Sequence, residues 1–235
     1  FGAESMGLNV SHGSHDMTPI GLTMTVGKKI LPSLVGIDIG CGMLAVKLGK
    51  IRNDFMKLDT VIRDNVPVGF AVRKDIHAYA DRIDLSNLKC FSHIRSEKAL
   101  LSLGTLGGGN HFIELDTAKN GEVFLIVHTG SRHLGKEVAE YYMKAGQDEL
   151  KDNGINDIPF EMTYLSGNLM EDYLHDLKIV EEYAILNRKI IAAEIIKKMK
   201  WKAIEEISCS HNYVDFSGNQ PILRKGAISA KLDEK

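Results

Sequence analysis

The sequence predicts an α+β fold in which mixed or antiparallel sheets surround a central cleft and helices flank them. Residues 112–115 and 122–128 form short apolar stretches with the length and composition of strands. Residues 168–200 place apolar side chains at helical spacing with charges on the other face, which predicts one long amphipathic helix or two in series. Three histidines each fall at a predicted strand edge beside small residues: His111, His128 and His211. These edges are expected to meet at the rim of the cleft.

Composition excludes several classes of protein. With 235 residues, 44% of them hydrophobic, the chain can bury a substantial core as one large or two small domains. The net charge of -2 argues against binding of nucleic acid through overall basicity, so a polyanion would have to be bound by local cations. The three cysteines, Cys41, Cys90 and Cys209, are too few and too scattered for a disulfide framework, which favours a reducing, cytoplasmic compartment. No apolar run approaches the roughly 20 residues of a membrane span, so no membrane is expected as a partner.

The first part of the chain predicts a leader and two extended segments. Residues 1–18 include a small, polar stretch that contains His12 and His15, and we interpret them as a leader of uncertain origin whose histidines are weak ligand candidates. Residues 20–26 alternate apolar residues with threonines and predict a strand. Residues 30–37 supply another apolar run, so a hairpin-like pair is the simplest interpretation.

An aspartate and a cysteine lie three residues apart in the glycine-framed segment 36–43. Asp38 and Cys41 follow an apolar stretch, which predicts that both lie at a corner between a strand and a loop. Taken singly, an Asp beside Gly usually shapes a turn and a buried Cys is usually inert. Together, and without competing side chains, they are candidate ligands.

Glycines dominate residues 103–114, with four of them within six positions. Their bare backbone allows an anion or a planar ligand to approach the amide groups closely. Asn110, His111 and Glu114 follow directly and place an amide, an imidazole and a carboxylate beside the loop. The alternative is a plain turn between a helix and a strand, with His111 capping it.

Two further helices are predicted before this loop. Residues 54–65 and 88–101 have helical spacing, and the first is closed by a proline and a glycine. His77 and His93 lie in polar surroundings, and we predict that both are solvated.

The apolar strand at 122–128 ends on His128, a position where active sites of sheet proteins collect, although a hydrogen-bonded core histidine is the ordinary alternative. Ser131 resembles an N-cap for a helix that continues to residue 145. Arg132 then lies in the first turn, where it can meet an anion together with the helix N-terminus.

The last part of the chain repeats this arrangement. Residues 204–208 predict a strand that leads to His211, again a histidine at a strand end. Arg224 and Lys225 add two cations next to a glycine, and their local pattern favours an exposed charged turn.

The candidate ligands at these strand and loop ends form one set: Asp38, Cys41, His111, His128 and His211. Five ligand groups exceed the need of a single tetrahedral ion, so a two-metal cleft with the Cys41 thiolate as a bridge is plausible, and by affinity the set prefers zinc over manganese. Arg132, Arg224, Lys225 and the glycine amides are suited to phosphate. Metal together with phosphate groups favours phosphoryl or nucleotidyl transfer.

Five segments carry a resemblance to one family. In order along the chain, they resemble motifs of the RtcB family of RNA-splicing ligases: residues 35–43, 103–114, 127–132, 211–213 and 224–227. The resemblance implies an RtcB-like fold over residues 19–235, as a single catalytic domain incomplete at its C-terminus. It also implies the joining of RNA 2′,3′-cyclic phosphate or 3′-phosphate ends to 5′-hydroxyl ends in tRNA splicing or RNA repair, with GTP and two manganese ions, and it leaves room for an activating protein partner.

The resemblance also implies residue roles. Asp38, Cys41 and His111 resemble the ligands of one manganese, and Cys41, His128 and His211 those of the second. The preference for manganese comes from the family, against the order of affinities. Parts of a guanylate pocket are carried by two short segments: Asn110, His111, Phe112, Ile113, Glu114, His211 and Asn212.

Two departures from the family pattern stand out. Residues 14–19 replace a Met-Pro-Asp and His-Gly-rich segment, and the guanylylated histidine of the family is expected beyond Lys235, so no nucleophile is assigned here. Two alternatives therefore stay open: a dinuclear metal phosphoesterase that acts without a histidine adduct, and an inactive remnant that binds metal and RNA.

Incubated with manganese and α-labelled GTP, these 235 residues are expected to form no acid-labile protein adduct. Each histidine at the site is assigned to metal, and His133, the other one near a motif, is assigned to the surface. Gel analysis of the labelled protein measures this, and a longer version that extends past Lys235 is expected to become labelled. Labelling of the short chain would mean either that a histidine named here is the nucleophile and the metal assignment is wrong, or that the mechanism differs from that of the family.

Overall fold

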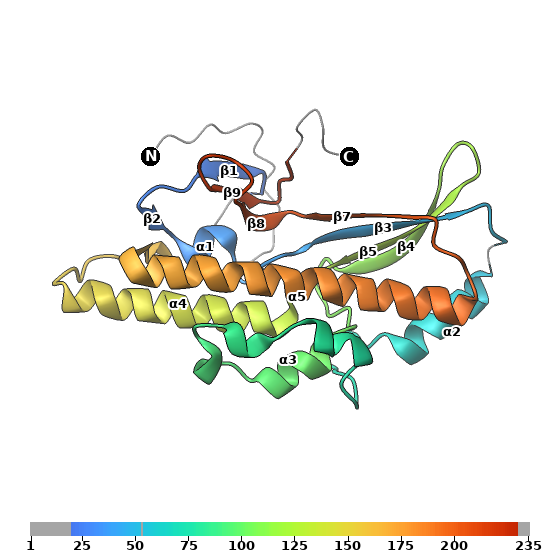
Figure 1. Ribbon diagram of the computed structural model, residues 1–235, viewed down its shortest axis with the longest axis horizontal. Helices are drawn as coiled ribbons and strands as arrows, with labels where there is room; N and C mark the ends of the chain where they lie inside the picture. Colours follow the sequence, from blue (N-terminus) through green and yellow to red (C-terminus); the bar gives the residue numbers. More distant parts are fainter. Residues whose placement is uncertain (1–19, 53, 230–235) are drawn as a thin grey trace.

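The computed structural model describes residues 20–52 and 54–229. Its spine is one long helix, α5 (Gly167–Met199), which runs along most of the molecule in Figure 1. A four-stranded sheet packs along α5, and the helix α4 (Arg132–Asp152) packs against α5 as well. The predicted leader, with His12 and His15, lies outside the described residues. Helices and antiparallel sheets together confirm the α+β class.

The largest sheet brings distant strand ends together. Its strands are β3 (Gly42–Gly49), β4 (Phe112–Thr117), β5 (Val123–Thr129) and β7 (Glu205–Ser210), in the order β4-β5-β3-β7. All neighbours are antiparallel, and Gly42 pairs with both Thr129 and Ser210. The start of β3 therefore lies between the C-terminal ends of β5 and β7, which is the geometry that a shared site at this edge requires.

Two smaller sheets complete the strands. One has the order β1-β9-β8, with β1 (Leu22–Thr25), β9 (Ile222–Lys225) and β8 (Asn212–Asp215), and the other pairs β2 (Lys29–Ile30) with β6 (Leu165–Ser166). Every strand pair in these sheets is antiparallel too. The prediction left open mixed or antiparallel sheets, and within the described residues all three sheets are antiparallel. The single parallel pairing there is an isolated bridge between Val68 and Gly107, outside the sheets.

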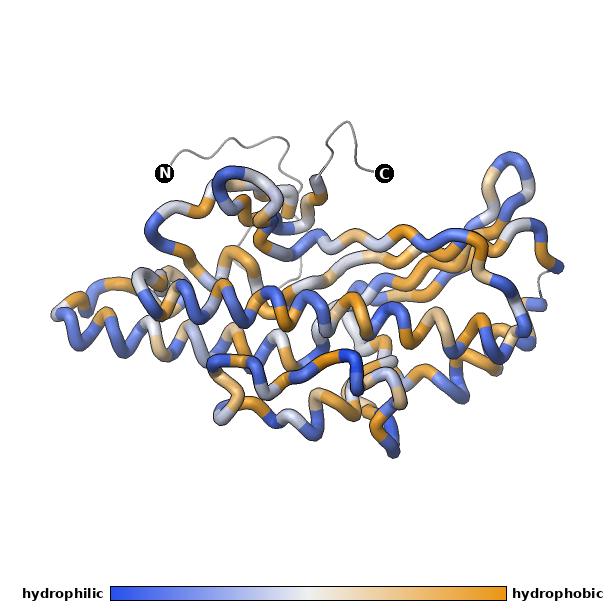
Figure 2. Tube along the Cα trace, in the orientation of Figure 1, coloured by the Kyte–Doolittle hydropathy of each residue, from blue (hydrophilic) through white to orange (hydrophobic). Residues whose placement is uncertain are grey.

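The helices cover the core on several sides. Asp54 caps α2 (Phe55–Asn65) through a 3.0 Å bond from the Lys57 amide, and α1 (Pro32–Val35) and α3 (Ser96–Ser102) are shorter. Four 3-10 helices add single turns: η1 (Ala78–Arg82), η2 (Leu85–Asn87), η3 (Phe91–His93) and η4 (Phe160–Met162). Apolar and polar residues recur along α4 and α5 in Figure 2, as expected for helices with faces in the core. No helix among the described residues is long and apolar enough to cross a membrane.

Helix α5 is central because it joins two apolar clusters. Tyr173 and Tyr183 pack with residues of α4 in the first cluster, and Ile191 and Ile195 pack with the inner face of β3 and β5 in the second. An ordinary surface helix buries one stripe, whereas α5 buries side chains toward both α4 and the sheet. The prediction of one long helix at 168–200 is confirmed in its single-helix form.

Several local predictions are wrong. No hairpin joins residues 20–26 to 30–37, because β1 pairs with β9 and Pro32 begins a helix, at a position where its missing amide hydrogen costs nothing. Only Ser96–Ser102 of the predicted helix at 88–101 is α-helical. Asp38 and Cys41 follow helix α1 and precede β3, and do not end a strand.

The predicted exposed turn at Arg224 and Lys225 is also wrong. Both residues belong to β9 and are 9% and 4% exposed. Arg224 bonds Asp215 at 3.2 Å, and the Lys225 ammonium donates to the Val35 carbonyl at 3.2 Å. The polar composition of this segment concealed a buried strand whose cations find their acceptors on Asp215 and Val35.

Candidate metal centre

The turn between α1 and β3 presents two of the candidate ligands. Asp38 and Cys41 lie within this turn, and Cys41 is only 2% exposed. The carboxylate of Asp38 packs against the backbone of Gly130, where an added Cβ would come within 2.1 Å of its Oδ1. Glycine at 130 is therefore required for Asp38 to reach its observed place.

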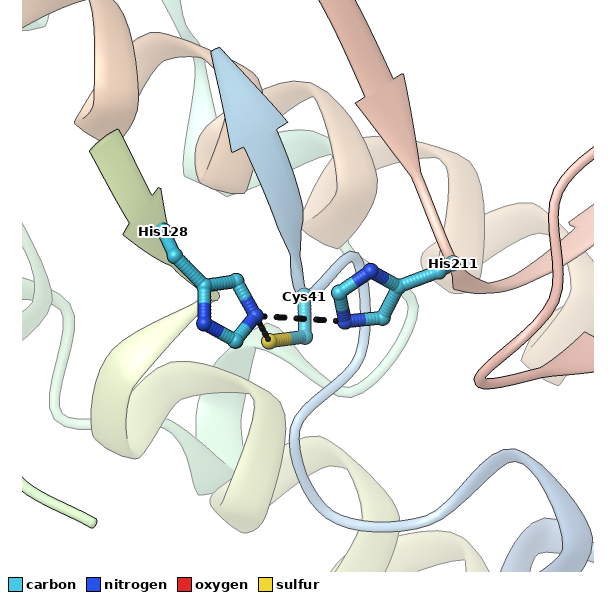
Figure 3. Close-up of side chains that lie close together, drawn as sticks. All are labelled: Cys41, His128 and His211. Carbon is cyan, nitrogen blue, oxygen red and sulfur yellow. Dashed lines mark hydrogen bonds between the residues drawn. The ribbon is translucent and has the colours of Figure 1, made fainter. Parts of the chain in front are cut away.

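Three histidines converge on this turn from other elements. His128 lies near the end of β5, His111 directly before β4, and His211 between β7 and β8. Figure 3 shows His128 and His211 pointing toward Cys41 from opposite sides. The Cys41 Sγ lies 3.4 Å from His128 Nε2 and 3.6 Å from His111 Nε2. The strand edges that carry the three histidines therefore meet, as expected, and they meet at Cys41.

The ligand atoms form two groups that share Cys41. Asp38, Cys41 and His111 form one group and Cys41, His128 and His211 the other, with all atoms of a group within 4.8 Å of one another. Two atoms bound to one ion at about 2.0 to 2.3 Å, at angles of roughly 90 to 110°, lie about 2.9 to 3.6 Å apart. The measured separations fall in this interval, including 2.9 Å from His111 Nε2 to Asp38 Oδ2 and 3.3 Å between the Nε2 atoms of His128 and His211. These separations suit ligand atoms around a metal ion, and Cys41 belongs to both groups.

Backbone carbonyls fix the orientation of two imidazoles. His111 Nδ1 lies 3.0 Å from the Leu106 oxygen, and His128 Nδ1 lies 3.0 Å from the Asn110 oxygen. A carbonyl oxygen only accepts hydrogen bonds, so each Nδ1 carries the proton and donates it. Once Nε2 has lost its proton, its lone pair points into the cluster, an arrangement common to metal-binding histidines.

Burial and charge set the protonation of the cluster. Burial and the neighbouring Asp38 raise the pKa of the Cys41 thiol far above its usual range. Burial acts to raise the pKa of Asp38, but the hydrogen bond and charge of His111 outweigh it and the pKa is lowered. Burial lowers the pKa of His128, and burial together with His128 lowers that of His211 to about 4. A divalent cation supplies the charge that a thiolate at Cys41 needs, and the lowered pKa values of His128 and His211 favour the neutral imidazoles that bind it.

Two adjacent residues of α5 hold the segments that carry these ligands. The guanidinium of Arg188 is fully buried and donates to the carbonyls of Gly40 at 2.7 Å and Thr129 at 2.8 Å. Asn187 accepts from the Gly104 amide at 2.7 Å and donates to the Gly130 carbonyl at 3.2 Å. The apolar spacing of this helix predicted its length but no role in the site. The signal in the sequence that could have indicated such a role is the polar pair Asn187 and Arg188 within the apolar stripe of the helix.

Arg132 lies beside the glycine-rich loop, as predicted. Its guanidinium packs over Gly107, and its NH1 lies 3.1 Å from His111 Nδ1. That ring nitrogen already donates to Leu106, so it offers NH1 no acceptor. Within residues 20–52 and 54–229, the buried Nε of Arg132 has no hydrogen-bond partner. A phosphate group beside this guanidinium would supply an acceptor that the described residues do not.

The other predicted phosphate and guanylate residues are distributed differently. The Asn212 amide group serves the framework, because Nδ2 donates to the Asp38 carbonyl at 3.3 Å and Oδ1 accepts from the Gly226 amide at 2.9 Å. Asn110 and Glu114 are exposed beside the cluster. The ring of Phe112 lies against that of His128, with centroids 5.1 Å apart, and Ile113 packs at the edge of the second apolar cluster. Arg224 and Lys225 are paired elsewhere, as described above.

Predictions about solvent exposure were made for three histidines outside the cluster: His77, His93 and His133. His93 is exposed, as predicted. His77 is not solvated, because its Nε2 lies 3.3 Å from Glu194 and its side chain is largely covered. A surface role for His133 is also wrong, since it is half-buried and its Nδ1 lies 3.3 Å from the Ser102 hydroxyl. Ser131 occupies the N-cap position of α4 but makes no capping bond through its side chain.

Comparison with known proteins gives consistent matches. A family model described as tRNA-splicing ligase RtcB matches residues 73–234. The RNA-splicing ligase RtcB of Escherichia coli (strain K12) is 28% identical over 253 residues, which cover 92% of this chain and 62% of the relative. The tRNA-splicing ligase RtcB of Nanoarchaeum equitans (strain Kin4-M) is 24% identical over 274 residues, which cover 86% of this chain and 56% of the relative. The chain thus spans less than two thirds of the length of these curated relatives.

Replacement of Cys41 by alanine is expected to abolish bound metal and to leave the fold intact. Both donor groups include the Cys41 sulfur, and the alanine side chain has no lone pair with which to bind a metal ion. Metal analysis after loading with manganese or zinc, together with circular dichroism, measures both effects and identifies the preferred ion. Cys209→Ala, on β7 but outside both groups, is the matched control and should bind metal normally. Equal metal content in wild type and Cys41→Ala would refute the assignment.

Acidification is expected to destabilise the metal-free protein as the pH falls from about 6.5 to about 4. The pKa of His211 is lowered from 6.5 to about 4 in the folded protein. Over this interval the unfolded chain binds a proton that the folded chain does not, so the free energy of unfolding decreases with falling pH. Urea unfolding at several pH values measures the slope. His211→Asn should flatten it, whereas substitution of the exposed His93 should not, and an unchanged slope in His211→Asn would contradict the prediction.

Proposed function

The chain belongs to the RtcB family of tRNA-splicing ligases, and from this premise we propose that it carries the metal and phosphate centre of an RNA ligase. The proposed reaction joins RNA ends that carry a 2′,3′-cyclic phosphate or a 3′-phosphate to 5′-hydroxyl ends, with GTP as the source of GMP and manganese as the metal. tRNA splicing is the task that the names of the relatives suggest. The placement of Cys41 in both donor groups is the observation that carries the proposal.

Two divalent ions would be held by the donors described above, with Cys41 shared. When bound, such ions neutralise phosphate charge and polarise phosphorus–oxygen bonds. The contribution of the protein is to hold the donors in place before substrate arrives. Carbonyl bonds to His111 and His128 fix the rings, and Gly130 leaves room for Asp38. Such preorganisation lowers the cost of stabilising charge during phosphoryl transfer.

The phosphate of the RNA end would be bound by Arg132 and the amides of the glycine loop. Gly108 and Gly109 are exposed, so an anion can reach their backbone without meeting side chains. Arg132 offers two nitrogens without acceptors at the same loop. Asn110 and Glu114, both exposed beside this loop, are the residues that we propose for contact with the guanylate.

A direct test supplies an RNA whose 3′-phosphate already carries GMP, together with an RNA that has a 5′-hydroxyl end. In the proposed step the hydroxyl oxygen forms a bond to the 3′-phosphorus, the bond to GMP breaks, and the hydroxyl proton passes to solvent. This substrate needs no histidine adduct, so the 235-residue chain with manganese is expected to yield joined RNA and GMP. Cys41→Ala should yield neither, and Cys209→Ala should behave as wild type.

The two alternative functions give different products in the same assay. A dinuclear phosphoesterase would release GMP or phosphate without joining the strands. An inactive remnant would bind metal and RNA and leave both strands unchanged. Either result with metal-loaded protein would overturn the proposed ligation.

Replacement of Arg132 by alanine is expected to weaken binding of a 3′-phosphorylated oligonucleotide by about 1.5 to 3 kcal/mol, the usual value for a hydrogen bond to a charged group. Metal content should stay the same, because Arg132 belongs to neither donor group. Fluorescence titration with 3′-phosphorylated and 3′-hydroxyl oligonucleotides measures the effect. Arg63→Ala, which removes an exposed arginine on α2, is the control. An unchanged affinity in Arg132→Ala would return this residue to a purely structural role at the start of α4.

A further inference from the structure

Phe70 is the most exposed large apolar side chain among the described residues, with an exposed fraction of 105%. Val68, two positions earlier, is 57% exposed. Burial of a phenyl ring is worth about 1.5 to 3 kcal/mol, so a ring left entirely in water is available to any partner that can cover it. The location of Phe70 decides which partner that is.

The segment that carries Phe70 is hydrogen-bonded to the glycine-rich loop. Leu106 donates its amide to the Pro67 carbonyl at 2.9 Å, and the Gly69 amide donates to the Gly107 carbonyl at 2.8 Å. Gly69, the residue directly before Phe70, is therefore bonded to the loop that leads to His111. The backbone bonds on the N-terminal side of Phe70 hold it at the rim of the site.

Arg132 connects the same segment to the metal centre. Its NH2 lies 3.5 Å from the Gly69 carbonyl, while its NH1 faces His111, whose Nε2 lies 3.6 Å from Cys41 Sγ. An exposed aromatic ring thus follows directly after a residue that contacts the arginine proposed to bind phosphate. In a nucleotide the base and the phosphate are joined through one sugar, so a phosphate at Arg132 would bring a base close to this rim.

We propose that Phe70 is a stacking platform for a base next to the 3′-phosphate of the RNA end. This inference rests on the proposed function, because it assigns the base that accompanies the phosphate at Arg132. A phenyl ring stacks on any base, since every base has a flat π-face, so the contact would add affinity without selecting a sequence. Gly108 is exposed next to Gly69, with the Gly69 Cα 3.9 Å from the position of a Cβ on Gly108, and it adds no side chain to this part of the surface.

The test measures binding of a short single-stranded RNA that ends in a 3′-phosphate to the manganese-loaded protein. Phe70→Ala is expected to weaken binding about 5- to 150-fold, the range for loss of one stacked base. Phe70→Leu keeps an apolar side chain but cannot stack and should weaken binding similarly, while Phe70→Trp should bind at least as tightly as wild type. Phe160→Ala, which removes a partly exposed ring on η4, is the matched control and should have no effect.

A second RNA that lacks its terminal base identifies the partner of the ring. Wild type and Phe70→Ala should bind this abasic RNA equally. Equal binding of the intact RNA by wild type and Phe70→Ala, or by wild type and Phe70→Leu, would overturn the inference and leave the proposed function in place. Loss of manganese in Phe70→Ala would also overturn it, because the ring would then support the metal centre. Failure of the wild type to bind 3′-phosphorylated RNA would instead overturn the proposed function.

Discussion

The buried guanidinium of Arg188 on α5 is the interaction on which the metal centre depends most. Its partners are Gly40, Thr129 and the Ser210 hydroxyl, and each of these directly precedes or follows a candidate ligand in the sequence. A buried charge is costly unless its donors are satisfied, so the three segments are held where their oxygens can accept. The Nε of Arg188 has no hydrogen-bond partner among the described residues, so displacement of any one of the three segments would leave the guanidinium short of a further partner. The fold thereby links the positions of Cys41, His128 and His211 through one side chain.

The same helix also fixes the second part of the site. Asn187 precedes Arg188 and binds the backbone at Gly104, Thr105 and Gly130. The glycine loop and the residue that makes room for Asp38 are therefore held by one amide. Arg188 has an electrostatic effect too, since its charge lowers the pKa of Cys41, against the larger effects of burial and Asp38. A permanent cation beneath the cluster thus favours the thiolate that a metal requires.

Periodic patterns predicted the helices with regular apolar spacing, and missed the elements that are determined by distant contacts. The spacing of apolar residues was sufficient for α2 and α5, and strand ends with histidines predicted where the ligands would meet. The pairing of β1 with β9 joins the two ends of the described chain, and nothing in residues 20–26 encodes that partner. Arg224 and Lys225 resembled a surface turn because the acceptors that allow their burial come from Asp215 and Val35. The role of Asn187 and Arg188 likewise depends on carbonyl groups that no side-chain pattern reveals.

The ligands of the centre come from segments far apart in the chain. Cys41 and His111 are separated by 70 positions, and His128 and His211 by 83. Contacts of such long range form only when most of the chain has been ordered, because each requires the closure of a long loop. A partly folded chain would offer an ion one or two donors at a time and bind it weakly. Metal uptake is therefore expected to report the completion of folding, and a bound ion would in turn stabilise the native state by mass action.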